Sequence, residues 1–238
     1  MNPGVVEIRL ADLDQLIDPL EALEARVGLL AADERAWQSN PSNDVIRRRR
    51  TARIALRVLL LRAGEPRARG DALQLDAGGK PFLPGSGHAF NISHSGGWAL
   101  LALASRGPVG IDIERPRAVA LGEARQGLIR AAGLGMTGDD FQSDGFLAAW
   151  TRLEAFAKAR GSGVGALLTE LGITASGSRA LRADEVARKA AAVVGASGLK
   201  VAALGLPAGL FGAVCAPAGD LDEAPSWSAL SAQECRVV

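Results

Sequence analysis

The chain has few cysteines, no long apolar run and almost no net charge. Cys215 and Cys235 are its two cysteines, too few for a disulfide framework or a zinc cluster. Lys and Arg total 27 against 26 Asp and Glu, so no overall field favours nucleic acid or a membrane as partner. No apolar span reaches the roughly 18 residues of a transmembrane helix, and Glu7 and Arg9 stand where a signal peptide is apolar. We therefore expect a cytoplasmic protein.

Helix-period and strand-period patterns alternate along the chain and predict an α+β protein. Helices are expected at residues 20–36, 44–63, 120–132, 145–160 and 183–194. Strands are expected at residues 5–10, 88–93, 98–104, 109–114, 171–175, 198–204 and 209–215. The glycine-rich residues 133–138 are expected to form a loop.

The dipeptide Gly107-Pro108 is the expected boundary between two lobes, residues 1–107 and 108–238. Glycine and proline interrupt regular structure most strongly, and this pair separates two predicted strands. Each lobe then mixes helices with a small sheet. Residues 217–238 carry no clear pattern, and we expect them to be loosely attached.

The stretch V-G-I-D-I-E, residues 109–114, places two carboxylates on one face of a strand. Asp112 and Glu114 are two residues apart, so their side chains point the same way, while Ile111 and Ile113 face the opposite side. Hard oxygen ligands on a rigid strand suit Mg²⁺, which binds one or two carboxylates together with phosphates and water. The alternative is an ordinary acidic strand face exposed to solvent.

The stretch W-T-R-L-E-A-F-A-K-A-R-G, residues 150–161, places a carboxylate and an ammonium group on one helix face. Glu154 and Lys158 are four residues apart and border the apolar stripe rather than lying opposite it. A surface ion pair is the simpler interpretation. The scarcity of lysine favours a functional one, because the chain has 23 Arg and four Lys, and a lysine supplies a compact point charge.

The stretch F-N-I-S-H-S-G-G-W, residues 90–98, carries Ser93 and His94. Neighbouring residues of a strand point to opposite faces, and no G-x-S-x-G elbow is present, so a serine hydrolase is disfavoured. His94 at a strand end can instead donate to a phosphate oxygen, beside a Ser-Gly-Gly turn. Further cations are Lys80 in a Gly-Lys-Pro turn and the arginines at 47–50, 53 and 57, which form either a solvated helix face or a phosphate site.

Together these blocks resemble the signature motifs of the Sfp-type 4'-phosphopantetheinyl transferases. The resemblance rests on F-N-I-S-H-S-G-G-W, P-V-G-I-D-I-E and W-T-R-L-E-A-F-A-K-A-R-G, in that order, with G-K-P upstream. An R-x-A-L-R run at Arg53 and the strand F-G-A-V-C-A extend it faintly over most of the chain.

The resemblance implies a monomer made of a pseudo-twofold pair of similar α+β lobes. Each lobe would be a small antiparallel sheet packed with helices, with coenzyme A and Mg²⁺, or Mn²⁺, in the cleft between the lobes. The reaction implied is transfer of the 4'-phosphopantetheine arm of coenzyme A to a serine of an apo acyl or peptidyl carrier protein. Adenosine 3',5'-bisphosphate would be released.

The resemblance also implies roles for individual residues. Asp112, Glu114 and Glu154 would bind the metal, Lys158 would lie beside the transferring phosphate, and Glu154 or a water would accept the serine proton. The residues that would contact coenzyme A are Lys80, Ser93, His94 and Arg53, the last two near its 3'-phosphate, with Arg35 as a fainter candidate for the same phosphate.

The sequence departs from the family pattern at two places. Leu153 stands where many members have Lys, and residues 115–146 lack the usual F-x-x-x-E block. Carrier preference, whether fatty-acid, polyketide or peptide-synthetase, is therefore left open. The alternatives are a catalytically silent relative that binds coenzyme A or a carrier protein, and an unrelated Mg²⁺-dependent nucleotide hydrolase, for which no Walker-type loop is present.

Overall fold

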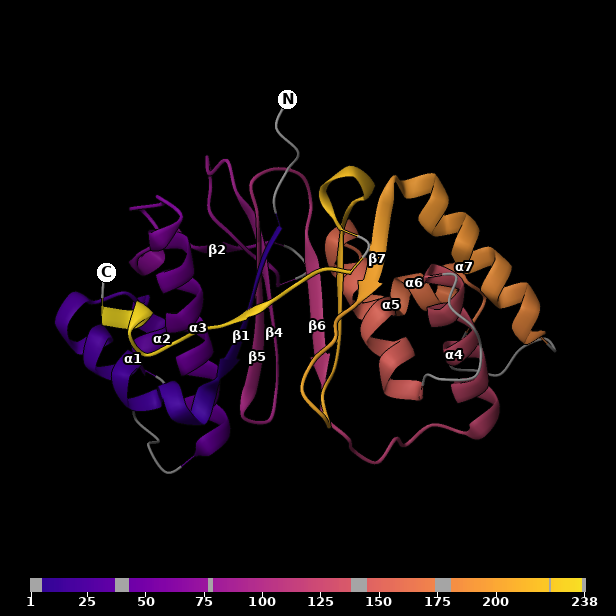
Figure 1. Cartoon of the computed structure of the whole chain (residues 1–238), viewed down its shortest axis with the longest axis horizontal. Coiled ribbons are helices and arrows are strands. Elements are labelled where there is room, and N and C mark those ends of the chain that lie inside the picture. Colours follow the sequence, from indigo (N-terminus) through magenta and orange to yellow (C-terminus); the bar gives the residue numbers. More distant parts are fainter. Residues whose placement is uncertain are drawn as a thin grey trace.

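A computed structural model describes residues 6–36, 43–76, 79–137, 145–173, 181–222 and 224–236. The predicted α+β class is confirmed, because small sheets and separate groups of helices make up the fold (Figure 1). The helices are α1 (Leu13–Val27), α2 (Ala32–Ala36), α3 (Asp44–Arg62), α4 (Glu123–Thr137), α5 (Phe146–Arg160), α6 (Val164–Glu170) and α7 (Ala183–Ser197). In this part of the chain, none of them is long and apolar enough to cross a membrane.

The first sheet has the strand order β4-β5-β1-β9. Its strands are β1 (Val6–Asp12), β4 (Ala89–Ser95), β5 (Trp98–Ala104) and β9 (Ser228–Ala229). Strand β5 pairs antiparallel with both β4 and β1, and β9 pairs parallel with β1. Buried leucines of α1 and α3, including Leu20, Leu56 and Leu60, share one hydrophobic core with Leu101 and Leu103 of β5. A short hairpin of β2 (Gln74–Leu75) and β3 (Pro81–Phe82) accompanies this part.

The second sheet has the order β6-β8-β7, with antiparallel pairing throughout. Its strands are β6 (Gly110–Glu114), β7 (Leu199–Ala203) and β8 (Phe211–Pro217). Helices α4 to α7 lie on the outer side of this sheet, as α1 to α3 lie beyond the first (Figure 1). Phe156 of α5 and Ala213 of β8 are buried in the core that joins these helices to the sheet.

A third apolar core joins the strands of the two sheets. Leu10 of β1 and Leu100 of β5 share it with Ile111, Ile113 and Val214 of the second sheet. Ile111 and Ile113 are buried in this core, so Asp112 and Glu114 lie on the other face of β6. This confirms the predicted alternation of side chains along the strand.

The expected loop at residues 133–138 is wrong for the described residues 133–137, which continue α4. A Cβ on Gly133 would lie 2.6 Å from Ala149 of α5, and one on Gly135 would lie 2.2 Å from the Ala187 carbonyl of α7. These glycines therefore allow close helix packing rather than ending the helix. The run G-L-G-M-T-G, which begins at Gly133, has the G-x-G-x-x-G spacing of dinucleotide-binding loops. Such a loop follows a strand and opens a helix, whereas the described part of this run lies inside α4.

Three further expectations differ from the structure. The first long helix begins at Leu13 and ends before Gly28, whose φ of 68° suits glycine; α2 follows separately. Helix α6 was not expected, and Leu171 to Ile173 are not a strand; residues 174–175 lie outside the described part.

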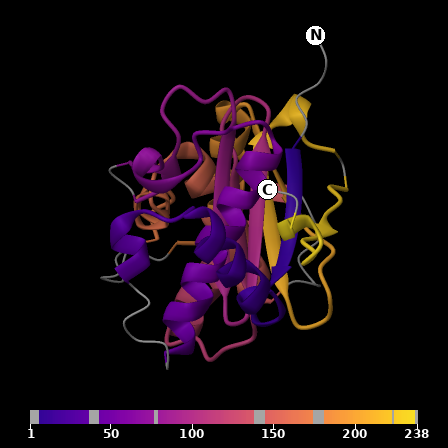
Figure 2. The same cartoon turned by 90° about the vertical axis from the view of Figure 1, so that its left-hand side faces the viewer.

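The C-terminal segment is attached, contrary to expectation. Leu230 and Cys235 are buried in the core of α1 and α3, and the Leu230 amide donates to the Leu10 carbonyl at 2.8 Å. Figure 2 shows this segment running beside β1. Part of the expected second lobe thus packs on the first.

Candidate active site

Strands β4 and β6 lie side by side, one from each sheet, and their side chains form polar contacts along their length. The Asn91 side-chain oxygen accepts from the Ile111 amide at 3.0 Å, Ser93 Oγ donates to Asp112 at 2.6 Å, and Ser95 Oγ donates to Glu114 at 3.2 Å. The spacing of two residues on both strands makes these contacts repeat. Both carboxylates of β6 therefore meet hydroxyl groups of β4.

Asp112 and Lys158 form a charged pair at the centre of this region. Lys158 Nζ on α5 lies 2.7 Å from Asp112 Oδ1 and also donates to Ser93 Oγ at 3.2 Å and to the Ile111 carbonyl at 3.3 Å. The Asp112 residue is 5% exposed. Burial raises the pKa of the Asp112 carboxyl, and the charge and hydrogen bond of Lys158 oppose that rise.

Glu154 lies one turn before Lys158 on α5, as its spacing predicted. Burial raises the pKa of the Glu154 carboxyl. The positive charge of Lys158 lowers it, whereas the negative charges of Asp112 and Glu114 raise it further. Glu154, which is distant from Asp112 and Glu114 in the sequence, thus lies close enough to both for their charges to affect its pKa.

Glu114, the third carboxylate, has an ion pair of its own. Arg117 Nη2 lies 2.8 Å from Glu114 Oε1, in addition to the Ser95 contact. Arg117 is half exposed. Glu114 could take another cation only if the Arg117 side chain moved aside.

Within the described ranges, no three His, Cys, Asp or Glu side chains are close enough together to form a ready metal-binding group. The chemistry of the acids nevertheless fits a divalent cation. Burial and mutual repulsion raise the pKa values of Asp112 and Glu154, and a hard cation would relieve both effects. The predicted metal residues share a region, and their role as ligands stays a prediction.

A pocket of about 150 Å³ adjoins this region on the side of α3. Its lining residues are Arg49, Ala52, Arg53, Ile92, Ser93 and His94. Arg53 and His94, predicted from different parts of the sequence, thus share one cavity, and Ser93 connects it to Asp112 and Lys158. A pocket with guanidinium and imidazole groups suits a phosphate.

Lys80 lies on the other side of Lys158. Its Nζ donates to the Val109 carbonyl at 2.9 Å and to the Lys158 carbonyl at 3.1 Å, and burial lowers its pKa. Lys80, Glu154 and Lys158 also line a smaller pocket of about 80 Å³. Lys80 thus ties the turn before β3 to β6 and α5. Gly78 of that turn lies outside the described residues.

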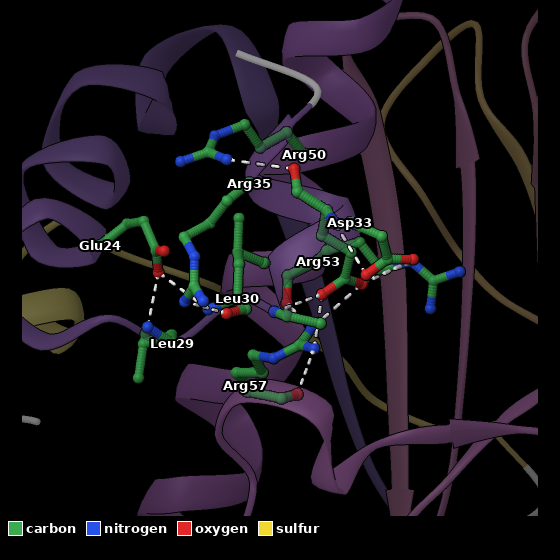
Figure 3. A network of polar contacts seen from close by, with 11 residues as sticks. Glu24, Leu29, Leu30, Asp33, Arg35, Arg50, Arg53 and Arg57 are labelled. Atoms are coloured by element: carbon green, nitrogen blue, oxygen red, sulfur yellow. Dashed lines mark hydrogen bonds and ion pairs between the residues drawn. The ribbon is translucent and has the colours of Figure 1, made fainter.

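The other arginines of α3 pair mainly with acidic groups of the first part of the chain. Arg57, 1% exposed, lies 2.6 Å from Glu34, and Arg50 lies 2.6 Å from Glu21. Arg35, on α2, donates to the Leu30 carbonyl at 2.5 Å and does not line the pocket (Figure 3). The structure therefore brings Arg49 and Arg53 to the site and holds Arg50 and Arg57 elsewhere.

Sequence reasoning missed Asn91, Ser95 as a partner of Glu114, and Glu34. The first two alternate with Ser93 along β4, and that period of two was the available signal. Glu34 lies 23 residues before Arg57, and no local pattern connects them.

The chain is similar to several known proteins. It is 38% identical to the 4'-phosphopantetheinyl transferase Sfp of Bacillus subtilis over 89 residues, which are 36% of this chain and 39% of that protein. It is 38% identical to the 4'-phosphopantetheinyl transferase AcpT of Salmonella typhimurium over 117 residues, 48% of this chain and 60% of that protein. No model of a protein family matches the chain.

The chain thus spans between about two fifths and three fifths of the length of these relatives. Both carry the enzyme name that the motifs predicted. The similarity confirms the predicted relationship to the Sfp-type 4'-phosphopantetheinyl transferases.

Proposed function

We propose that this relative of the Sfp-type 4'-phosphopantetheinyl transferases moves the 4'-phosphopantetheine arm of coenzyme A to a serine of an apo carrier protein. Adenosine 3',5'-bisphosphate is the second product. The observation that supports this most is the position of Ser93, between the pocket of Arg53 and His94 and the Asp112–Lys158 pair. We further propose a cytoplasmic monomer of two pseudo-twofold lobes, residues 1–107 and 108–238, with the C-terminal strand β9 of the latter joined to the sheet of the first lobe.

Asp112, Glu114 and Glu154 would hold Mg²⁺ or Mn²⁺ in this proposal. When bound, the metal neutralises diphosphate oxygens of coenzyme A. The support is electrostatic, because the carboxylates outnumber the lysine they share and burial keeps water from screening them.

Lys158 holds the transferring phosphate in position and offsets the charge that develops on the leaving group. Its ammonium group already faces several oxygen atoms, those of Asp112, Ser93 and Ile111. It is therefore oriented before substrate binds, and such a fixed charge lowers a barrier without reorganisation.

Glu154 accepts the proton of the carrier serine, directly or through one water. Burial raises the pKa of the Glu154 carboxyl; a bound metal ion would oppose that rise, so the transfer runs through the water when Glu154 is also a metal ligand. Because Glu154 and Lys158 are on consecutive turns of α5, the proton acceptor and the stabilising charge are held on one rigid element.

Arg53 and His94 bind the 3'-phosphate of coenzyme A, with Ser93 and Lys80 nearer the diphosphate. Both side chains line the same pocket. Arg35 would first have to release the Leu30 carbonyl, so the proposal places the phosphate on Arg53 and His94.

The test is incubation of the purified chain with coenzyme A, Mg²⁺ and a panel of apo carrier proteins from fatty-acid, polyketide and peptide synthesis. Intact mass should show addition of one phosphopantetheine arm to at least one carrier. A carrier whose serine is replaced by alanine is the control. No addition to any carrier under conditions where a known transferase modifies the same panel would contradict the proposal.

A catalytically silent relative that binds coenzyme A or a carrier protein is the second candidate. It is favoured by the ion pair of Glu114 with Arg117, which would have to open before Glu114 could bind metal. Coenzyme A binding by calorimetry without any mass change in the carriers would identify it. An unrelated hydrolase would instead release phosphate without a carrier.

A further inference from the structure

Glu34 is a buried carboxylate that the proposed reaction does not use. It lies on α2, outside the motif blocks, and is 9% exposed. Its side chain accepts a hydrogen bond from the Ala31 amide at 3.1 Å and from Arg57 Nη2 at 2.6 Å. Figure 3 shows the region around this network, with Arg53 and Arg57 labelled.

Arg57 is held rigidly by this network. Its guanidinium donates to Glu34 and to the Gly70 carbonyl at 3.3 Å, and it is 1% exposed. A buried arginine requires an opposite charge, because an unpaired buried charge is strongly unfavourable. Glu34 therefore has one clear structural partner.

Glu34 has a second basic neighbour, and this one lines the phosphate pocket. Arg53 Nε lies 3.9 Å from Glu34 Oε1, and the Arg53 side chain is 16% exposed. Burial lowers the pKa of the Arg53 guanidinium, the charge of Glu34 opposes that effect, and the like charges of Arg57 and Arg49 add to it. Without Glu34, the buried Arg57 and the partly buried Arg53 would repel each other across one helical turn.

We propose that Glu34 is a positioning residue that holds Arg53 in the pocket, and thereby sets the affinity for a phosphomonoester bound there. This inference rests on the proposed function, in which that phosphomonoester is the 3'-phosphate of coenzyme A. Glu34 does not touch the ligand and acts through Arg53. Its removal should therefore weaken only ligands that carry the phosphate.

Glu24 provides a matched control within the same network. It is also buried, at 5% exposure, and its carboxylate accepts the Leu29 and Leu30 amides at 2.6 and 3.0 Å (Figure 3). Its carboxylate supports the segment that leads into α2 and binds the amides of that segment rather than Arg53. The variant Glu24→Gln therefore tests whether loosening the segment before α2 is enough to change phosphate binding.

The experiment compares coenzyme A with dephospho-coenzyme A by isothermal titration calorimetry at one Mg²⁺ concentration. Glu34→Gln should weaken the binding of coenzyme A by about tenfold. This factor corresponds to the loss of one charge-assisted contact between Arg53 and the phosphate. It should change dephospho-coenzyme A by less than about twofold. Glu24→Gln should leave the ratio of the two affinities at its wild-type value.

Glu34→Gln leaves Arg57 without its charged partner and could unfold the chain, so a second variant is needed. The double variant Glu34→Gln/Arg57→Gln removes both charges of the buried pair, which is milder than removing one. It should show the same loss of the phosphate-dependent affinity. A cycle with Arg53→Ala should be non-additive, because Glu34 acts through Arg53.

The outcomes separate this inference from the function on which it rests. If wild type prefers coenzyme A, Arg53→Ala loses that preference and both Glu34 variants keep it, the positioning role is overturned and the proposed function stands. Equal weakening of both ligands by the Glu34 variants also overturns it, since a purely structural role predicts that. If wild type does not distinguish the ligands, the phosphate pocket and this inference are overturned together.

Discussion

Among the described residues, the buried charged cluster around Glu34 and the one around Asp112 differ in how their charges are balanced. In the first, each fully buried arginine has a close carboxylate, because Arg57 lies 2.6 Å from Glu34 and Arg50 lies 2.6 Å from Glu21, whereas the more exposed Arg53 lies farther from Glu34, at 3.9 Å. In the second, Asp112 and Glu154 share Lys158, and their carboxyl pKa values are raised. A balanced buried pair is compatible with a structural role, whereas an excess of one sign weakens the fold and marks a functional site.

The two clusters also meet the same ligand in the proposed function. The pocket with Arg53 adjoins the balanced cluster, and the carboxylates with Lys158 form the unbalanced one. The first should therefore control how tightly coenzyme A binds, and the second how fast the arm is transferred. Substitutions in the two clusters should separate affinity, rate and stability.

The largest expected effect is on the rate, in the unbalanced cluster. Asp112→Ala should lower transfer by about 100- to 1,000-fold or more, the scale for losing a group that stabilises transition-state charge. Added Mg²⁺ should not restore it. Lys158 keeps access to water, with its side chain 27% exposed, so the fold should persist. Intact mass of an apo carrier over time measures the rate.

Asp184→Ala is the control, because Asp184 is an exposed acid of α7 whose partners are Arg182 and Arg188. It removes the same charge away from the cluster. Transfer by Asp112→Ala at the wild-type rate would show that the carboxylate assignment is wrong.

The next effect is on stability, in the balanced cluster. Arg57→Met should reduce the free energy of unfolding by about 3–5 kcal/mol, because removing one partner leaves the other charge buried. Urea unfolding measures it. Arg188→Met removes an exposed arginine and should leave the midpoint almost unchanged. Equal midpoints for Arg57→Met and wild type would mean that the buried pair contributes nothing to the fold.

The sequence predicts the unbalanced cluster much better than the balanced one. Asp112 and Glu114 follow from strand alternation, and Glu154 and Lys158 from helix spacing, because both patterns are local. The electrostatic coupling of these residues needed the packing of α5 against β6, which the motif resemblance implied and local patterns could not show.

The balanced cluster was not predictable because its partners are distant in the sequence. Arg50 and Arg57 looked like members of one cationic set, and only the fold places Glu21 and Glu34 beside them. The same limit applies to Gly133 and Gly135. Glycine weakens a helix locally, but the close approach of α5 and α7 requires it.

A smaller effect concerns affinity at the phosphate pocket. His94→Ala should weaken coenzyme A by about tenfold, because a hydrogen bond to a charged group contributes about 1.5–3 kcal/mol. Dephospho-coenzyme A should change little, and the maximal transfer rate should stay near that of wild type. His88→Ala is the matched control, since His88 pairs with Glu65 and does not line the pocket. If the binding of both ligands weakens equally, the assignment of His94 to the 3'-phosphate is wrong.

The smallest effect is on stability and has the opposite sign to that in the balanced cluster. Burial raises the pKa of Glu154 above its ordinary value of 4.5, so the folded state binds the proton more tightly than the unfolded state. Stability therefore falls as pH rises from about 4.5 through the raised pKa, and the cost persists above it. Glu154→Gln removes this cost.

Glu154→Gln should accordingly raise the melting temperature at pH 8 by about 2–4 °C, the shift expected for ~1 kcal/mol in a chain of this size. The gain should largely disappear at pH 4, where most of the wild-type carboxyl is protonated in both states. Calorimetry in the presence of a chelator measures both values. Glu34→Gln, the same chemical change in the balanced cluster, should lower the melting temperature. If Glu154→Gln also lowers the melting temperature, the excess of carboxylates around Lys158 does not destabilise the fold. The proposed difference in charge balance between the two clusters would then be wrong.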